Sequence, residues 1–317
     1  MPEPTLSDIH VDSALTDFSV AYFQDHARFA APNVFPITNV NKRSDKYYVY
    51  DRNEIMRSDA KKRAPNTEAP VRGYKLSTDS YHCEVYSVAV DVSEQERANA
   101  DPALDPEEDA ARITTNDILT KMDRVWTNEM FSTGIWATES TATWSSSTGA
   151  RNTVEDLQFG IMTVLEETGF RPNTLVLGAE SWYTGLWTST DLLNRLPDNA
   201  PRIITTEFIQ QMFGFDRVFV LDAVENTGTA GSSGASPSFI HEDHALVCYV
   251  DPNAGLRQAT AGKTFMWSGL TGGAGGVRTK RLEMPWKDAM PRVETDAAFD
   301  FKVVASDLGI LFKNTVS

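Results

Sequence analysis

The residues that could bind a metal ion are few and gather in one place. Five histidines are spread over 317 residues, and only His241 and His244 lie close together, with Glu242 and Asp243 between them. Zinc proteases place two histidines four residues apart on a helix. Here the pair stands where a loop meets an expected strand. We therefore predict a solvated loop, with a metal site as the alternative.

A glycine-rich run is the second candidate for chemistry. Residues 272–276 read Gly-Gly-Ala-Gly-Gly and could be taken for a phosphate-binding loop. Such a loop follows a strand and opens a helix, so that backbone amides and the helix dipole face the phosphate. This run instead precedes residues 277–281, whose alternation is typical of a strand, and no Gly-Lys-Ser/Thr follows. We predict a flexible connection.

Motifs for hydrolysis or sugar binding are weaker still. There is no Gly-x-Ser-x-Gly elbow, and no catalytic pair stands out among 44 scattered acidic residues. Trp182, Trp187 and Trp267 could form a sugar platform, but we expect them to anchor the core. The sequence predicts no enzyme, no cofactor and no metal site. A hydrolase or sugar-binding protein is kept as an alternative.

Composition limits the function classes further. The formal net charge is −15, and so acidic a surface disfavours binding to a phosphate backbone, although not the enclosure of DNA. The chain shows neither a secretory signal nor a membrane span. Its two cysteines, Cys83 and Cys248, are too few for a disulfide framework. We predict that both are small buried hydrophobes in a reducing cytosol.

The basic residues are concentrated in one segment. Residues 42–75 hold ten basic and five acidic residues, a net charge of +5, so the remaining chain carries −20. Residues 52–75 are here named the basic finger, and residues 94–109 the acidic run. Either both are solvated loops, or the finger of one subunit lies on the acidic run of a neighbour, where opposite charge sets register. The second hypothesis assigns an intersubunit interface to Arg57, Lys61, Lys62, Arg63, Arg72, Glu94, Glu96, Glu107 and Glu108.

One long helix is the clearest element that must position these segments. Asp105 suits an N-cap, Pro106 the first helical position, and Glu108 completes a capping-box pattern. Apolar residues follow at helical spacing until Gly134, which predicts a half-exposed helix over 106–133, about 40 Å long at 1.5 Å per residue.

The other elements alternate between helix and strand. Residues 1–45 are expected to form an arm, and residues 46–91 a β-hairpin with strands at 46–51 and 81–91 and a tip too long for an ordinary loop. Further helices are expected at 153–168, 181–187, 191–196 and 207–213. Further strands are expected at 174–177, 217–221, 244–250, 277–284 and 292–305. This order predicts an α+β fold.

Several short motifs, in this order, resemble the major capsid protein family of tailed bacteriophages, which has the Hong Kong 97-type fold. The resemblance covers about residues 20–315 and rests on segments 21–25 (AYFQD), 34–37 (VFPI), 46–50 (KYYVY), 64–68 (APNTE) and 303–312, which contains Asp307-Leu308-Gly309.

The resemblance implies a division of the chain and a function. It implies an N-terminal arm at 1–45, an extended loop at 46–85, a peripheral domain at 86–199 with a spine helix at 106–133, an axial domain at 200–290, and a return to the peripheral domain at 291–317. The implied function is a subunit that self-assembles, as hexamers and pentamers, into the icosahedral shell of a virion. An encapsulin-type bacterial nanocompartment shell is the alternative of the same fold.

The resemblance also implies partners. Portal protein and scaffold or decoration proteins are expected, with enclosed double-stranded DNA that is not read by sequence, no membrane, and assembly in the host bacterial cytoplasm. Some relatives carry an N-terminal scaffolding segment, whereas the resemblance here begins near residue 20, so assembly is expected to use a separate scaffold or none. No Lys–Asn pair for covalent crosslinking can be matched.

Overall fold

The computed structural model describes most of the chain in ordered segments. These are residues 25–50, 56–69, 71–73, 76–99, 105–141, 143–144, 152–196, 203–228, 236–253, 258–271, 277–284 and 290–316. Most of the predicted arm, the glycine run at 272–276, parts of the basic finger and the side chain of Glu96 lie outside the described residues.

The long helix is α4, Pro106–Met130. Its N-cap is Asp105, whose carboxylate accepts from the backbone N–H groups of Glu107 and Glu108, as the capping pattern predicts. The helix ends three residues before the predicted position. The indole N–H of Trp136 donates to the carbonyl of Met130 at 2.7 Å, and this bond occupies an acceptor that a further helical turn would need.

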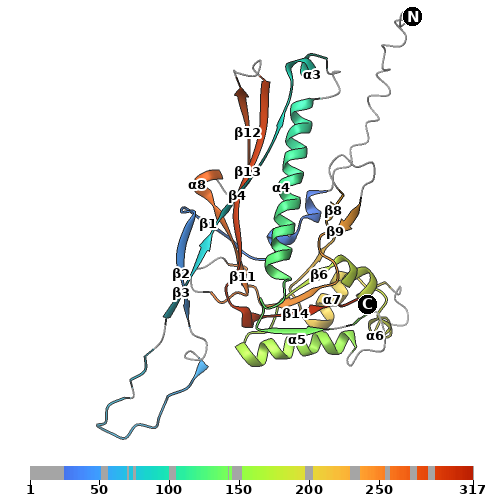
Figure 1. Ribbon diagram of the computed structural model, residues 1–317. Helices are drawn as coiled ribbons and strands as arrows, with labels where there is room; N and C mark the ends of the chain where they lie inside the picture. Colours follow the sequence, from blue (N-terminus) through green and yellow to red (C-terminus); the bar gives the residue numbers. More distant parts are fainter. Residues whose placement is uncertain are drawn as a thin grey trace, which may run out of the picture.

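A sheet of five strands runs along α4 (Figure 1). Its central strand is β13 (Met290–Val303), flanked by β12 (Val277–Met284) and β4 (Glu84–Asp91). Strand β11 (Gly262–Trp267) pairs with the end of β13, and β1 (Ile37–Val40) pairs with β11. The buried hydroxyls of Thr114 and Thr295 lie 2.9 Å apart and join α4 to this sheet.

A second five-stranded sheet lies at the C-terminal end of α4. Its order is β5 (Thr138–Thr141), β14 (Gly309–Lys313), β10 (Ala245–Cys248), β6 (Thr174–Gly178) and β7 (Arg217–Leu221). Alternating residues face opposite cores. Leu246 and Leu311 pack with α4, whereas Val247 and Phe312 pack with α5 (Thr153–Thr168) and α7 (Thr206–Phe213). Both faces are therefore buried.

The expected helices and strands at 153–168, 174–177, 207–213, 217–221 and 277–284 are confirmed within one residue at each end. The N-cap of α5 is Asn152, the residue before the helix, which forms a capping box with Glu155. The remaining elements are η2 (His26–Arg28), η3 (Ala31–Asn33), α3 (Glu94–Asn99), η4 (Ser181–Leu186), α6 (Thr190–Leu193), β8 (Val224–Asn226), β9 (Pro237–Phe239), α8 (Ser268–Thr271) and η5 (Ser306–Leu308).

The hairpin differs from its prediction in its second strand. Strand β2 (Ser44–Tyr50) pairs with β3 (Leu76–His82), whereas residues 84–91, expected in the same hairpin, form β4 of the long sheet. The separation occurs at Cys83, whose backbone N–H donates to the carbonyl of Arg43 and whose side chain is fully buried. The chain leaves the hairpin there and enters the other sheet.

The two sheets divide the chain differently from the predicted domains. Strand β6, from the predicted peripheral segment 86–199, pairs with β7 from the predicted axial segment 200–290. Strands β11 and β12, from the axial segment, pair with β13. The chain crosses between the sheets several times, which local patterns cannot reveal. The peripheral and axial assignments stay predictions.

Candidate intersubunit surfaces

The basic finger projects from the body of the molecule beyond β2 and β3 (Figure 1). Among its described residues from 57 to 73, every side chain is exposed except Asp59, which is half-buried. A segment exposed on all sides gains almost no hydrophobic stabilisation from its own chain. Within the described chain, its conformation depends on hydrogen bonds and ion pairs inside the finger.

Ion pairs and a hydrogen bond join the two sides of the finger at Arg57, Asp59 and Arg72. The carboxylate of Asp59 pairs with Arg57 at 2.6 Å and lies 3.8 Å from Arg72. The guanidinium of Arg72 also donates to the carbonyl of Arg57 at 2.5 Å. The bond from Arg57 lowers the pKa of Asp59, so this carboxylate stays ionised. Two of the five predicted finger cations therefore have a partner within the finger.

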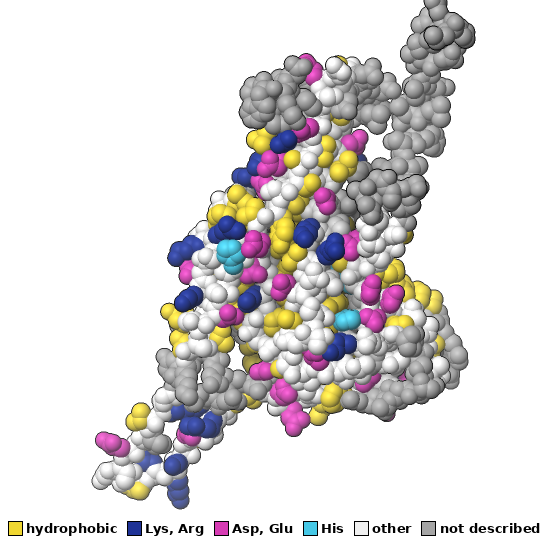
Figure 2. All heavy atoms as spheres, viewed as in Figure 1, with side chains coloured by type: hydrophobic (Ala, Val, Ile, Leu, Met, Phe, Trp, Pro, Cys, Tyr) yellow, Lys and Arg dark blue, Asp and Glu magenta, His cyan; other side chains and the backbone are white. Residues whose placement is uncertain are grey.

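The tip carries the other three cations. Lys61, Lys62 and Arg63 are exposed, and no ion pair joins them to another residue of the described part of the chain. Figure 2 shows dark blue side chains gathered on this projecting segment. A turn follows, in which the hydroxyl of Thr67 donates to the carbonyl of Ala64. The tip therefore exposes three consecutive cations, with the exposed Glu68 after the turn.

The root of the finger is anchored by aromatic stacking. Tyr81 stacks on Phe265 of β11 with ring centroids 4.6 Å apart, and Tyr47 contacts the same ring at 5.8 Å. The hydroxyl of Tyr47 donates to Asp79 at 2.7 Å. Burial and this hydrogen bond raise the pKa of Tyr47, so the phenol keeps its proton. The backbone N–H of His82 adds a bond to Asp300.

The acidic run lies at the far end of the molecule from the finger (Figure 1). Glu94 is exposed, but Glu107 pairs with Arg281 at 2.9 Å and Glu108 pairs with Arg112 at 2.6 Å. The structure thus does not bring the predicted cations and acids together within one chain. A contact between them requires a second copy. Two of the four predicted interface acids, Glu107 and Glu108, already form ion pairs with arginines of their own chain.

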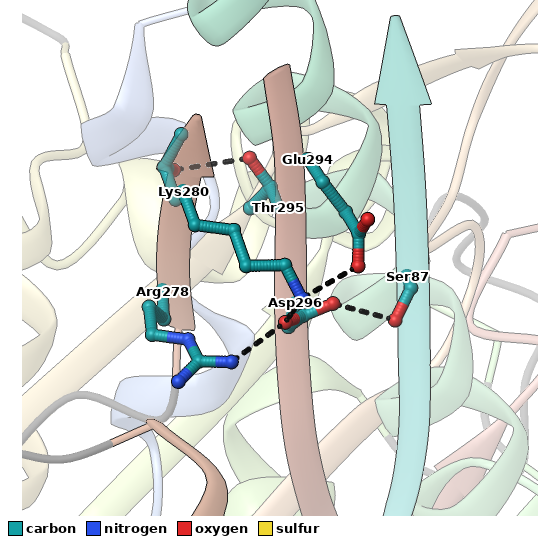
Figure 3. A network of polar contacts seen from close by, with 7 residues as sticks. Ser87, Arg278, Lys280, Glu294, Thr295 and Asp296 are labelled. Carbon is teal, nitrogen blue, oxygen red and sulfur yellow. Dashed lines mark hydrogen bonds and ion pairs between the residues drawn. The ribbon is translucent and has the colours of Figure 1, made fainter. Parts of the chain in front are cut away.

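A charged network on the long sheet was not predicted from the sequence (Figure 3). Asp296 of β13 accepts from Lys280 at 2.9 Å, from Arg278 at 3.1 Å and from Ser87 at 2.7 Å. Lys280 also pairs with Glu294 at 2.7 Å. The signal was the alternation of cations at 278 and 280 and acids at 294 and 296, which becomes meaningful only once β12 is paired with β13.

The network consists of ion pairs and hydrogen bonds between neighbouring strands of the sheet. Bonds to Glu294 and Asp296 raise the pKa of Lys280, which keeps its ammonium charged. Burial would raise the pKa of Asp296, but the bonds from Lys280, Ser87 and Arg278 outweigh it and lower the pKa to about 2. A charged ammonium and an ionised carboxylate form an ion pair and do not react with each other.

Replacing Asp296 with asparagine will lower the free energy of unfolding at pH 7 by about 1–2 kcal/mol, after allowance for solvent screening of its partly exposed partners. Because folding lowers the pKa of Asp296, its contribution is present above the unfolded value, near 3.9, and is lost as the pH falls through about 2. The difference from wild type in urea unfolding should therefore shrink toward pH 2. An equal difference at both pH values contradicts the prediction, and Asp117→Asn, on the exposed face of α4, is the control.

The expectation of a solvated loop at the histidine cluster is wrong for His241. Its side chain is fully buried, 2.7 Å from the hydroxyl of Thr127 and 3.3 Å from the carboxylate of Asp123. Trp126 and Phe131 meet its ring edge to face. The acidic and polar neighbours in the sequence concealed this burial. No group of three or more potential metal ligands occurs among the described residues.

Other predicted residues are placed as follows. Cys83 and Cys248 are buried, as predicted, and burial raises the pKa of each thiol to about 12, so neither is reactive. Trp182 is a core residue, as predicted, but Trp187 is 46% exposed, with its indole N–H donating to the carbonyl of the buried Ile204. Within the described residues, no helix is long and apolar enough to cross a membrane.

Comparison with solved structures identifies the fold. A phage-related protein from Bordetella bronchiseptica RB50 is 15% identical, with a TM-score of 0.65 over 96% of this chain and 97% of that chain. The capsid of the cyanophage P-SCSP1u is 10% identical, with a TM-score of 0.54 over 88% and 86%. The encapsulin of the holo-SrpI complex from Synechococcus elongatus PCC 7942 is 12% identical, with a TM-score of 0.53 over 96% and 95%.

No protein-family model and no curated protein sequence matches the chain. The structural matches nevertheless extend over nearly its whole length. The chain therefore has the α+β fold of Hong Kong 97-type capsid proteins, and the prediction of that fold is confirmed.

Proposed function

We propose that the chain is the major capsid protein of a tailed bacteriophage. In this proposal it self-assembles, as hexamers and pentamers, into an icosahedral shell that encloses double-stranded DNA. Its role is structural, carried by interfaces between copies and not by a catalytic site. The shell is part of the virion and is assembled in the cytoplasm of the host bacterium.

One observation carries the proposal beyond the fold. The finger is exposed over its described residues, is anchored at its root by Tyr81 and Phe265, and ends in three cations without an ion pair to the rest of the described chain. Such a segment is stabilised when it lies on another subunit. A shell surrounds each copy with neighbours, and a formally acidic body offers the tip complementary charge.

The net charge also suits a container for DNA. A wall with a formal charge of −15 per subunit repels the phosphate backbone and leaves the enclosed DNA mobile. A closed head needs a portal for DNA entry, and scaffold or decoration proteins are the other expected partners. The chain itself encloses the DNA without binding to a particular sequence.

An encapsulin-type shell is the second candidate, supported by the match to the encapsulin from Synechococcus elongatus. The predicted arm of about 45 residues and the long basic finger favour the first candidate. The two differ in their contents. Shells isolated from the native source should contain double-stranded DNA, and shells filled with an enzyme instead would favour the nanocompartment.

The full-length purified chain should sediment as hexamers, pentamers or closed shells when its concentration is raised. Sedimentation velocity at several salt concentrations measures this directly. A chain that stays monomeric at every concentration and salt contradicts the proposal and favours a hydrolase or sugar-binding protein of this fold.

A further inference from the structure

A buried polar cluster joins α4 to segment 240–244, which leads from β9 into β10. Asp123 and His241 are both fully buried, with Nε2 of the imidazole 3.3 Å from Oδ2 of the carboxylate. The other ring nitrogen, Nδ1, lies 2.7 Å from the hydroxyl of Thr127, one turn further along α4. The cluster therefore connects two parts of the molecule 118 residues apart in sequence.

Segment 240–244 is itself built into the second sheet. The carbonyl of His241 accepts from the backbone N–H of Ala179, and the carbonyl of Asp243 accepts from that of Thr315. A side chain at Gly178 would collide with the carbonyl oxygen of Glu242. Segment 240–244 is therefore bonded to the ends of β6 and β14, and the cluster is a joint between helix and sheet.

The hydrogen bonds allow two protonation patterns for the cluster. The hydroxyl of Thr127 donates to the carbonyl of Asp123 at 3.0 Å, and its oxygen then needs an N–H at Nδ1 of His241. With that N–H in place, the contact between Nε2 and Asp123 needs one more proton, on either partner. If Thr127 instead donates to Nδ1, the extra proton is absent and Asp123 is a bare carboxylate.

Burial favours the pattern with the extra proton. Without it, the site carries a net charge of −1 among Trp126, Phe131 and other apolar groups, and an uncompensated buried charge is strongly unfavourable. The second oxygen of Asp123, Oδ1, has no hydrogen-bond partner within the described part of the chain, so nothing there offsets a full negative charge. Burial also raises the pKa of Asp123 despite the opposing bond and charge of His241.

We infer that Asp123 and His241 share one bound proton in the folded chain at neutral pH, so that the joint between α4 and segment 240–244 weakens as the pH rises. The inference is independent of the proposed function. It assigns a pH-sensitive contact to this fold at a position away from both the finger and the acidic run.

The other titratable groups near the joint are accounted for. On segment 240–244, His244 pairs with Asp243 at 2.8 Å, and its ring stacks on that of Phe131. Glu242 precedes them and is exposed. On α4, Arg124 points to Glu225 of β8 at 3.6 Å. The pKa of Asp123 is shifted by its burial and, in the opposite direction, by His241.

The test is the pH dependence of urea unfolding of the full chain, followed by tryptophan fluorescence. Histidine in the unfolded chain loses its proton near pH 6.5, whereas the folded pair retains its extra proton. Above pH 6.5, unfolding of the wild type should therefore release one proton, and the folding equilibrium constant should fall up to tenfold per pH unit. Between about pH 4.5 and 6.5 the pair contributes no slope, because both states then hold the same number of protons.

Asp123→Asn is the informative variant. Its amide can donate to Nε2 of a neutral His241 while Nδ1–H donates to Thr127, so the cluster stays neutral without the extra proton. The variant should lack the wild-type fall above pH 6.5, whereas Asp117→Asn, on the exposed face of the same helix, should retain it. Parallel profiles for all three proteins overturn the inference.

A second measurement decides the matter if Asp123→Asn fails to fold. Magic-angle-spinning NMR of the chain labelled with ¹⁵N-histidine serves assembled and unassembled protein alike, and the signal lost in His241→Gln identifies His241. The inference expects that signal to stay unchanged from pH 6 to 8. A His241 signal that titrates like histidine in water, near pH 6.5, overturns it.

Discussion

Replacing Trp126 with alanine will lower the free energy of unfolding by about 3–5 kcal/mol, the largest single-residue effect that we expect. Trp126 is fully buried at the C-terminal end of α4. Its ring lies 6.1 Å from that of Phe35 in the N-terminal segment, 5.1 Å from Phe131 and 5.7 Å from His241. The substitution leaves a cavity where three segments distant in sequence meet, so the site cannot collapse easily.

Chemical denaturation of the unassembled chain measures this loss. Ile113→Ala is the matched control, because Ile113 lies on the same helix and is 48% exposed, so its truncation should cost less than about 1 kcal/mol. Equal effects of the two substitutions would contradict the position assigned to Trp126. A small effect of Trp126→Ala alone would show that the core around α4 can repack.

The second large effect is expected on assembly. Changing Lys61, Lys62 and Arg63 together to glutamate reverses the charge of the finger tip and should reduce the yield of shells at least tenfold. If the tip lies on an acidic surface, like charges then meet across the interface, and that costs several kcal/mol per contact. Folding of the subunit should change by less than about 0.5 kcal/mol, because these side chains are exposed.

Light scattering during assembly at low salt measures the effect, and urea unfolding checks the fold. The matched control replaces the same three residues with glutamine, which removes the attraction without adding repulsion. Its assembly should be weakened less than that of the glutamate variant, and added salt should narrow the difference. Wild-type assembly of the glutamate variant at low salt would show that the finger is only a solvated loop.

Elements set by local signals were predictable from the sequence. Asp105 and Pro106 marked the start of α4, and the cap geometry is the one expected of those residue types. The concentration of cations in residues 42–75 marked the finger before its projection was known. Such features depend on neighbours within a few positions along the chain.

Features that depend on distant residues were not predictable. Glu107 was assigned to an intersubunit interface, and its partner within the chain, Arg281, is 174 residues away. His241 was expected in a solvated loop, but its environment is made by α4, 118 residues earlier. The strand at 84–91 was assigned to the nearer hairpin, although it pairs with β13. In each case the environment of the residue is set by a tertiary contact with a distant part of the chain. The neighbouring residues in the sequence do not indicate that contact.

We propose that the finger of one copy is ordered by lying on another copy in a shell. Electron cryomicroscopy of the purified full-length chain, after assembly, tests it most directly. We predict closed shells in which residues 57–73 of each subunit are ordered across the boundary to a neighbouring subunit. Shells whose fingers project into solvent without touching a neighbour would contradict that role of the finger, and a stable monomer at every concentration and salt would contradict the whole account.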